Sequence, residues 1–498
     1  MIDLPPRQVA ERVTLLLNTP ESRTLDFKRI GGKHSRLMET VCAFANTEGG
    51  LLAIGIGDVK ALKPGEKPEA RLFGIEENAE GFDAFRRELA VCLDPPVEGL
   101  HWLWLPCTLR DGKAGHVVLL RIEKSEKVHS VVNDGTWTRM DSSNSELAAA
   151  KIAELHYQRG VRSAASETVP VPLSLLVTDT WKSFVAARGL SPGSIAEQLG
   201  RIGLANHVGD EVHPTRAAVL LFAEEPGSLL AAHDTRADIR VMVYEGKAAL
   251  LEATPNLQKA AKTVRGPLIV QIDKAVRLVL DELAHGITLS GSGFKTRHVY
   301  PERVVKEAIV NAVIHRDYRL NRDIFVRIFD DRIEVESPGV FPGSITPANI
   351  GKAESKARNP LIAMNLREFP VAPNIDAGEG VKMMFAQMAL AKLYPPLYSQ
   401  NTEKAVESVT VTLLNHERPS VWDEVSDWID RNGEMANSDL REIAKVETLE
   451  ASRMLRSWVE QGVLVPMANR AKRNMAYMKP QQPPEQGSLL SEGLDNKP

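Results

Sequence analysis

The sequence predicts a multidomain protein of mixed α/β (α+β) class, and three observations support this prediction. The chain has 498 residues, which at about 150 residues per domain is enough for about three domains. Stretches that alternate like strands are interleaved with stretches of helical periodicity. A small, polar, proline-spaced segment at 159–172 predicts a linker after the first mixed region.

The composition of the chain indicates which kinds of partner and cellular compartment to expect. The chain is 43% hydrophobic and 25% charged with a formal net charge of −4, so any contact with nucleic acid must come from local patches. Cys42, Cys92 and Cys107 form no CxxC pair, which argues against a zinc ribbon and fits a reducing cytoplasm. We expect a cytoplasmic protein without membrane contact, because the sequence shows neither a signal peptide nor a run of about 18 apolar residues.

The first region, 1–158, begins with an amphipathic helix that ends at Thr19-Pro20. We then expect the strand TLDFKRI, the helix SRLMETVCAFANTEGG, the buried strand LLAIGIG, the helix GFDAFRRELAVCL and two strands around the turn 110–113. The glycines that close the second helix indicate a structural turn, because glycine lets the chain reverse direction.

Three carboxylates lie at the ends of two of these strands: Glu21, Asp26 and Asp58. If the strands are neighbours, the acids converge beside Lys28 and can hold a divalent metal for phosphodiester hydrolysis. The alternative is that they are solvated acids at strand ends, and spacing alone favours this alternative.

The region 173–300 contains helices and strands but no recognisable chemistry, and we expect it to connect its neighbours. In 301–415, Pro301 suits the first turn of a helix in which Glu307, Asn311 and His315 recur at i, i+4 and i+8 and so share one face. A carboxylate one turn before a carboxamide can position water and ligate Mg²⁺, whereas the alternative is a polar helix face in water.

Two strands, IFVRIF and RIEVES, follow this helix, and Pro338-Gly339 forms the next turn. Gly378-Glu379-Gly380 then precedes the helix VKMMFAQMALAKL. Glycines that open a helix expose backbone N–H groups at its positive end, which suits phosphate oxygens. They also serve simply to separate two elements, so this signal is weak by itself.

The region 418–480 predicts three helices and a hairpin in the arrangement of a winged helix-turn-helix. On the third helix Leu449 is expected in the apolar face, while Arg453 and Arg456 project toward a groove of DNA. Eight Lys/Arg against five Asp/Glu over 436–480 give a local charge of +3. Three of these eight basic side chains lie in the predicted wing: Arg470, Lys472 and Arg473. A docking or dimerisation role is the alternative, and 481–498 has the composition of a disordered tail.

The motifs EAIVNAVIHRDY, VESPG, KARNP and GEG together resemble the GHKL ATPases, in the branch found in bacterial predicted regulators with an N-terminal Schlafen-type domain. This resemblance implies a Bergerat-type α/β sandwich with ATP and Mg²⁺, in which Glu307 polarises the attacking water and Asn311 ligates magnesium. It also implies a mobile lid at 343–377 and a last strand at 406–414. The other implied nucleotide contacts are His315, Ser337, Gly339, Arg358, Asn359, Gly378 and Gly380. Ser337 replaces the acid that holds the adenine amino group in the wider superfamily, and a hydroxyl accepts that hydrogen bond less strongly.

The segments ESRTLDFKRI, TVCAFANTEGGLLAIGIGD and TWTRMDSSN are similar to the AlbA-type domain of the Schlafen family. The resemblance implies nucleic-acid binding, with Lys28 and Arg139 as contacts. In animal Schlafen nucleases three acids cut RNA, and they correspond here to Glu21, Asp26 and Asp58, with Mg²⁺ or Mn²⁺ as the metal. Asp26 is one methylene shorter than the glutamate of those enzymes.

These resemblances imply a cytoplasmic regulator, and a homo-oligomer, in which an ATPase module controls a Schlafen-like domain and a winged-helix DNA reader, in transcription or phage defence. Two alternatives remain: an ATP-gated, metal-dependent nuclease acting on RNA or single-stranded DNA, and a DNA-binding repressor that only senses ATP.

Overall fold

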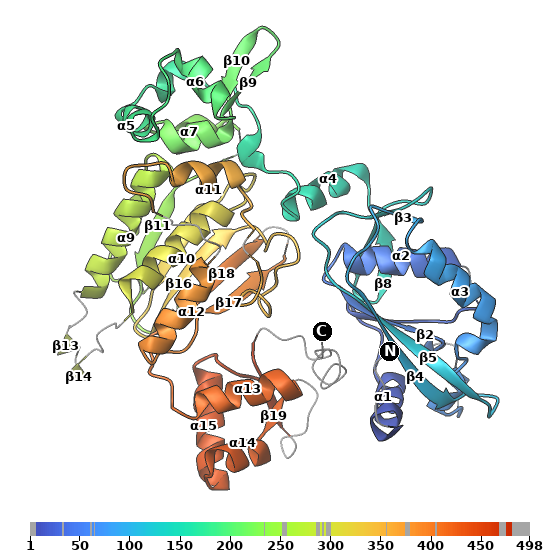
Figure 1. Cartoon of the computed structure of the whole chain (residues 1–498). Helices are drawn as coiled ribbons and strands as arrows, with labels where there is room; N and C mark the ends of the chain where they lie inside the picture. Colours follow the sequence, from blue (N-terminus) through green and yellow to red (C-terminus); the bar gives the residue numbers. More distant parts are fainter. Residues whose placement is uncertain are drawn as a thin grey trace. The chain divides into compact units, whose positions relative to one another are not determined.

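A four-stranded sheet forms the centre of the N-terminal part of the chain (Figure 1). Its order is β1-β2-β5-β4, with β1 parallel to β2 and the other pairs antiparallel. The strands are β1 (Leu25–Lys28), β2 (Gly50–Ile54), β4 (Leu100–Thr108) and β5 (Ala114–Ile122). The strands expected from the alternating pattern are therefore confirmed. Asp26 lies within β1, and Glu21 lies shortly before it in the chain.

Both faces of this sheet are covered, because alternate residues of its strands point to opposite sides. Leu52, Ile54 and Val118 pack with α2 (His34–Ala45) and α3 (Ala79–Glu88). Leu51, Ala53 and Val117 pack with α1 (Pro6–Asn18). This part also contains β3 (Leu93–Asp94), β6 (Ser130–Val131), β7 (Trp137–Met140), β8 (Ser143–Glu146) and α4 (Ala149–Gln158), as well as short 3-10 helices at Pro68–Arg71 and Ile75–Asn78.

The structure, a computed structural model, describes residues 6–31, 34–59, 62–63, 65–233, 235–250, 256–284, 289–290, 293–294, 300–354, 356–373, 379–403, 406–467 and 475–480. The chain divides into two compact units, Met1–Val161 with Asp423–Pro498 and Arg162–Trp422. The mixed α/β class is confirmed. No helix in these ranges is both long and apolar enough to cross a lipid bilayer, and all three cysteines are free thiols.

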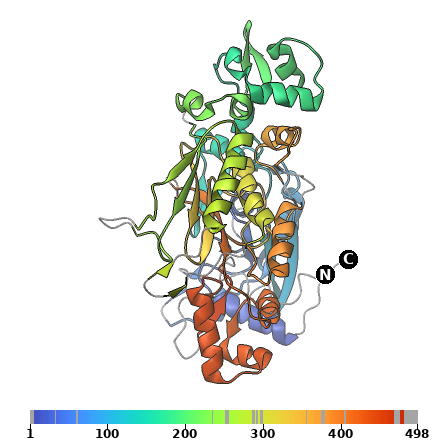
Figure 2. The same ribbon diagram turned by 90° about the vertical axis from the view of Figure 1, so that its left-hand side faces the viewer.

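A six-stranded sheet organises the second unit, in the order β12-β11-β15-β16-β18-β17. Its strands are β11 (Ile239–Val243), β12 (Lys262–Val264), β15 (Ile324–Ile328), β16 (Arg332–Pro338), β17 (Leu397–Asn401) and β18 (Ser408–Leu414). The long helices α9 (Leu268–Ala284), α10 (Glu302–His315) and α12 (Gly380–Leu390) lie over one face (Figures 1 and 2). Strands from both 173–300 and 301–415 thus share one sheet, while the predicted division of the chain into domains stays a prediction.

A smaller helical group precedes this sheet in the chain. The group contains α5 (Asp179–Arg188), α6 (Ile195–Arg201), α7 (Arg216–Phe222), α8 (Pro226–Ala231) and the hairpin of β9 (Ala205–Val208) with β10 (Glu211–Pro214). Its helix α7 contacts α9 and α11 (Pro360–Leu366). Trp181, Phe184 and Phe222 form its aromatic centre, with Phe369 packed beside Phe184. The segment 159–172, expected as a polar linker, instead buries Ala164, Ala165, Val169 and Val171.

The C-terminal part consists of α13 (Trp422–Asn432), α14 (Asn437–Ala444) and α15 (Thr448–Glu460) with three short strands. The strands β19 (Met435–Ala436), β21 (Ala476–Met478) and β20 (Val465–Pro466) pair in that order. Leu440, Leu455 and Trp458 are buried in its core. Leu449, expected in that core, is instead 67% exposed. The name winged helix stays a prediction for this part, and the predicted tail lies outside the described residues.

Gly49 makes the turn between α2 and β2 possible, as the sequence predicted. Its φ is +79°. A Cβ at this position would lie 2.7 Å from Ile122 O and 2.9 Å from Lys124 N, which are backbone atoms and cannot move aside as a flexible side chain could. Beside it, Asn46 is 2% exposed and donates to His129 O at 2.7 Å and Trp137 O at 2.9 Å. The turn therefore holds the C-terminal end of α2 against both the sheet and β7.

We predict that Gly49→Ala destabilises the N-terminal part more than Gly112→Ala does. Gly112 has a similar φ of +82°, but no atom lies within 4 Å of the position that a Cβ would take there. Its substitution therefore costs only the backbone strain of about 1–2 kcal/mol, whereas the position 49 variant adds a backbone clash to that strain. Thermal unfolding of both full-length variants measures the difference, and equal losses of midpoint temperature would contradict the crowding argument.

Candidate functional site

A cavity of about 530 Å³ lies between α10, α12 and the strands β16, β17 and β18. Its apolar floor includes Val335, Val409 and Val411 from the sheet. Four cations and three acids also line it: Arg303, Lys306, Lys356, Lys382, Glu307, Glu354 and Glu379. A cavity of this size, lined by both apolar and charged residues, can hold a small ligand that has an apolar part and a charged part.

The helix α10 supplies the central polar residues of the cavity. Glu307, Asn311 and His315 all line it, so the face predicted from their spacing exists and points into the cavity rather than into water. Residues between them, including Ala308, Ile309 and Val313, are buried in the core. Within the described part of the chain, the amide nitrogen of Asn311 is buried without a hydrogen-bond partner. A buried polar group of this kind costs free energy unless a ligand or water satisfies it.

The first turn of α12 meets the Glu307 carboxylate. A Cβ at Gly380 would overlap the Oε1 atom of Glu307, so glycine at this position permits a close approach of the helix start to the carboxylate. The N-terminal end of a helix carries partial positive charge and free N–H groups. This end of the cavity therefore favours negative charge. Gly378, the other predicted glycine, lies outside the described residues.

Ser337 lies in the cavity on β16 and is 7% exposed. Its hydroxyl donates to the backbone oxygen of Ala312 at 2.8 Å. Because its single hydrogen is committed to that bond, the oxygen is left to accept a hydrogen bond from a ligand. Another predicted contact, Gly339, also lines the cavity; its φ is +116°, and a Cβ there would lie 2.9 Å from Cβ of Asp317.

Arg358 and Asn359, implied as nucleotide contacts by the resemblance, do not line the cavity. They are 2% and 1% exposed, at the start of α11. The Arg358 guanidinium lies 3.5 Å from Asp317 Oδ2 and donates to Val340 O, while the Asn359 amide donates to the backbone at the end of α10. Both residues support the wall of the cavity from behind, so direct contact with a ligand would require rearrangement.

Tyr398 is a cavity residue that sequence reasoning missed. Burial, and to a lesser extent the nearby Glu307 carboxylate, raises the pKa of its phenol well above the usual value, so the phenol stays neutral. Nothing in the local sequence marks this tyrosine, because it enters the site only through the pairing of Tyr398 with Val411 at the edge of the sheet. Lys306 and Lys382 were also missed, although Lys306 precedes Glu307 directly and Lys382 follows Gly380 by two residues.

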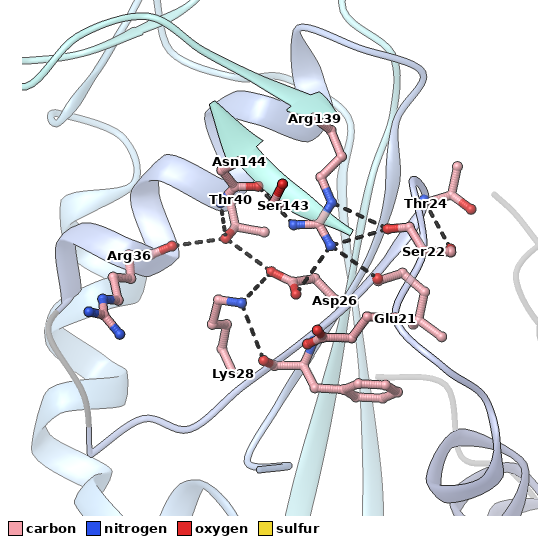
Figure 3. A network of polar contacts seen from close by, with 12 residues as sticks. Glu21, Ser22, Thr24, Asp26, Lys28, Arg36, Thr40, Arg139, Ser143 and Asn144 are labelled. Atoms are coloured by element: carbon pink, nitrogen blue, oxygen red, sulfur yellow. Dashed lines mark hydrogen bonds and ion pairs between the residues drawn. The ribbon is translucent and has the colours of Figure 1, made fainter. Parts of the chain in front are cut away.

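A second polar cluster surrounds Asp26 in the N-terminal part (Figure 3). Asp26 is fully buried, and its carboxylate lies 2.6 Å from Lys28 Nζ and 3.2 Å from Arg139 Nη2. Thr40 donates to the same carboxylate at 3.2 Å. The charge of Asp26 is therefore already balanced by two cations of the protein.

Arg139 is 2% exposed and held on every side. Its Nη1 donates to Asn144 Oδ1 at 2.8 Å, and its Nη2 donates to Ser22 O at 3.1 Å and Leu25 O at 3.3 Å (Figure 3). This arrangement corrects the expectation that Arg139 contacts nucleic acid directly. A guanidinium committed to a buried carboxylate and three oxygen atoms has no face left for a phosphate.

Glu21 joins this cluster, but the three predicted acids do not assemble into a metal site. Glu21 accepts from Phe27 N at 3.2 Å, and burial together with neighbouring Asp26 raises the pKa of its carboxyl. Asp58 is close enough to the buried guanidinium of Arg71 to affect its pKa. Burial lowers the pKa of Arg71, and the negative charges of Asp58 and Glu21 raise it by a smaller amount. Nowhere in the described ranges do three His, Cys, Asp or Glu side chains gather closely enough to hold a metal. The nuclease role of these acids stays a prediction.

The predicted nucleic-acid contacts on α15 are accessible. Arg453 and Arg456 are exposed, and Leu449 lies on the same side one and two turns earlier. Lys28 is only 27% exposed in its side chain and is paired with Asp26. Arg470, Lys472 and Arg473 lie outside the described residues.

Comparison with known proteins identifies two regions of the chain. Residues 21–148 match the family model described as Schlafen, AlbA_2, and residues 321–413 match the model described as putative ATP-dependent DNA helicase recG C-terminal. The chain therefore carries a Schlafen/AlbA domain and a GHKL-like ATPase module. The second match begins after α10 and does not include Glu307 or Asn311, so their roles stay a prediction.

No curated protein matches the chain. Among solved structures, the crystal structure of the DIP2311 protein from Corynebacterium diphtheriae is similar at 16% sequence identity, covering 95% of this chain and 99% of that chain. The TM-score is 0.39, too low for this likeness to bear on the fold or the function.

We predict that Arg139→Ala destabilises the N-terminal part by about 3–5 kcal/mol, because it leaves part of a buried charge uncompensated. The double variant Arg139→Ala/Asp26→Asn should recover much of that loss, since the charge is removed with its partner. Denaturant unfolding of the single and double variants measures both effects. A stable Arg139→Ala protein that has lost only nucleic-acid affinity would overturn the structural role.

Proposed function

We propose that this protein binds ATP with Mg²⁺ in the cavity between α10 and α12, and that the bound nucleotide regulates how other parts of the chain engage nucleic acid. The observation that carries the proposal is the row of Glu307, Asn311 and His315 on one helix face, lining a cavity of about 530 Å³. The match of 321–413 to an ATPase-type model and of 21–148 to the Schlafen/AlbA model supports it.

The residues of the cavity fit a nucleotide and its metal ion. The carboxamide of Asn311 is buried with an unsatisfied nitrogen, and rotation by 180° exchanges its nitrogen and oxygen, so it serves either a phosphate oxygen or a cation. Magnesium accepts oxygen ligands and usually binds through one or two protein groups plus phosphates. We therefore assign Asn311 to hold the metal, which would supply charge neutralisation at the phosphates.

The phosphate end of the ligand belongs at the start of α12. Gly380 opens that helix against the Glu307 carboxylate, and Lys306 and Lys382 line the same cavity. Helix N–H groups and lysine ammonium groups both stabilise phosphate charge. Glu307 is then placed to accept a proton from water near the phosphates, which makes it our candidate base for hydrolysis. A protein that only senses ATP would use the same cavity without this step.

The base end belongs against the sheet, beside Ser337. The hydroxyl of Ser337 already donates to Ala312 O, so toward a ligand it acts as an acceptor. An acceptor at this point favours a purine with an amino group over one with a keto oxygen. Adenine selectivity is therefore retained although serine replaces an acid.

The nucleic-acid side of the proposal rests on the Schlafen/AlbA domain and on α15. Arg453 and Arg456 are exposed along one side of α15, in a part of the chain with a local charge of +3 from eight basic and five acidic residues over 436–480. Such a face suits phosphate and base-edge contacts in a major groove. We propose a winged-helix DNA reader here, and a role in transcription or phage defence for the whole protein. The charge pairing around Asp26 does not favour the nuclease alternative.

We predict that Asn311→Ala weakens ATP binding by tenfold or more in the presence of Mg²⁺, a loss of about 1.4 kcal/mol or greater. Asn206→Ala, which removes an exposed amide on β9, should bind like wild type. Isothermal titration calorimetry of the full-length proteins measures both affinities. If wild-type protein binds no nucleotide, or Asn311→Ala binds as tightly as wild type, the assignment of the site is wrong.

We further predict that Ser337→Ala weakens ATP binding severalfold but leaves the binding of ITP nearly unchanged, because ITP has a keto oxygen in place of the adenine amino group. One neutral hydrogen bond contributes about 0.5–1.5 kcal/mol. Ser399→Ala, an exposed position on β17, is the matched control. Equal weakening of ATP and ITP by Ser337→Ala would show that the hydroxyl supports the wall of the cavity rather than reading the base.

A further inference from the structure

Asn359 joins three segments that are far apart in the sequence. Its amide nitrogen donates to Ile314 O at 2.8 Å and to Arg316 O at 2.7 Å, where α10 ends. Its amide oxygen accepts a 2.8 Å hydrogen bond from the hydroxyl of Ser163. With 1% of its surface exposed, this carboxamide has both donors and its acceptor engaged inside the protein.

The neighbouring residue connects the same point to the wall of the cavity. Arg358 donates to Val340 O and lies 3.5 Å from Asp317 Oδ2. Val340 lines the cavity, as do Glu307 and Asn311 on α10. A ligand that shifts α10 or the segment around Val340 therefore acts directly on the partners of Arg358 and Asn359.

The hydrogen-bond partner of Asn359, Ser163, belongs to a packed segment that follows Met1–Val161 of the first compact unit in the sequence. Arg216, 8% exposed, donates to Ala164 O at 2.7 Å and pairs with Glu167 Oε2 at 2.9 Å. Val169 N donates to Pro214 O at 2.9 Å. The segment 163–169, part of the predicted linker 159–172, is thus bonded to the helical group on one side and to Asn359 on the other.

We propose that Asn359 is a positioning residue that couples nucleotide binding in the cavity to the conformation of the segment 163–169. The coupling acts through its hydrogen bond with Ser163. The proposal rests on ATP binding in the cavity, as proposed above, and adds the route by which binding is felt elsewhere. Because the carboxamide is planar and fully bonded, the end of α10 cannot move relative to Ser163 without altering at least one of these hydrogen bonds. A shift of the end of α10 is therefore expected to act on the hydrogen bond between Asn359 and Ser163.

The test measures backbone hydrogen exchange over 163–169 in the full-length protein, with and without saturating ATP and Mg²⁺. Ser163→Ala removes only the bond to Asn359 and leaves the amide donors of Asn359 on α10. Ser166→Ala is the matched control, because the Ser166 hydroxyl is exposed and bonds to the local backbone at Ser163 O. Ser163→Thr restores a hydroxyl at the coupling position.

We expect ATP to change the rate of backbone hydrogen exchange over 163–169 at least threefold in wild type, Ser166→Ala and Ser163→Thr. In Ser163→Ala we expect no such change in the rate. All four proteins should bind ATP within about twofold of one another by calorimetry. Binding without any change in wild-type exchange, or an undiminished change in Ser163→Ala, would overturn this inference and leave ATP binding intact. Absence of nucleotide binding in wild type would instead remove the proposed function and this route together.

Discussion

The organisation of the second unit depends on how α10 is buried. Most of its residues, from Val304 to Ile314, pack into the core, yet the helical repeat brings Glu307, Asn311 and His315 to one inward strip. A polar strip inside a protein is costly unless it is bonded. The structure leaves a cavity along this strip, and among the described residues the buried amide nitrogen of Asn311 has no hydrogen-bond partner.

The Schlafen/AlbA domain meets the same constraint differently. Asp26 is a charged group inside the protein, and there the cost is offset by protein cations, Lys28 and Arg139. The cluster is closed by Thr40 and Asn144, which link α2, β1 and the β7–β8 hairpin. Asp26 is paired with two cations although its Oδ1 atom accepts no hydrogen bond, whereas the buried amide nitrogen of Asn311 has no partner of either kind in the described part of the chain.

The two proposals have a common physical basis. Nucleotide recognition is assigned to groups that face the cavity, and communication is assigned to groups immediately behind its wall. Arg358 and Asn359 belong to the second set, because both are buried and bonded to backbone oxygens rather than directed at the cavity. The resemblance to the GHKL family implied that they contact the nucleotide, but in the structure it is Lys356 and Ala357 of the same motif that line the cavity.

The sequence by itself determined the elements and the polar face of α10, because both follow from periodicities of 2 and 3.6 residues that are local properties of the chain. It also determined the Gly49 turn, where only backbone freedom is at issue. Only the tertiary structure decided that Arg139 is buried, that Leu449 is exposed, that Tyr398 enters the cavity and that Ser163 meets Asn359. Each of these depends on partners that are distant in sequence, and a local pattern contains no information about which partner satisfies a charge or covers a side chain.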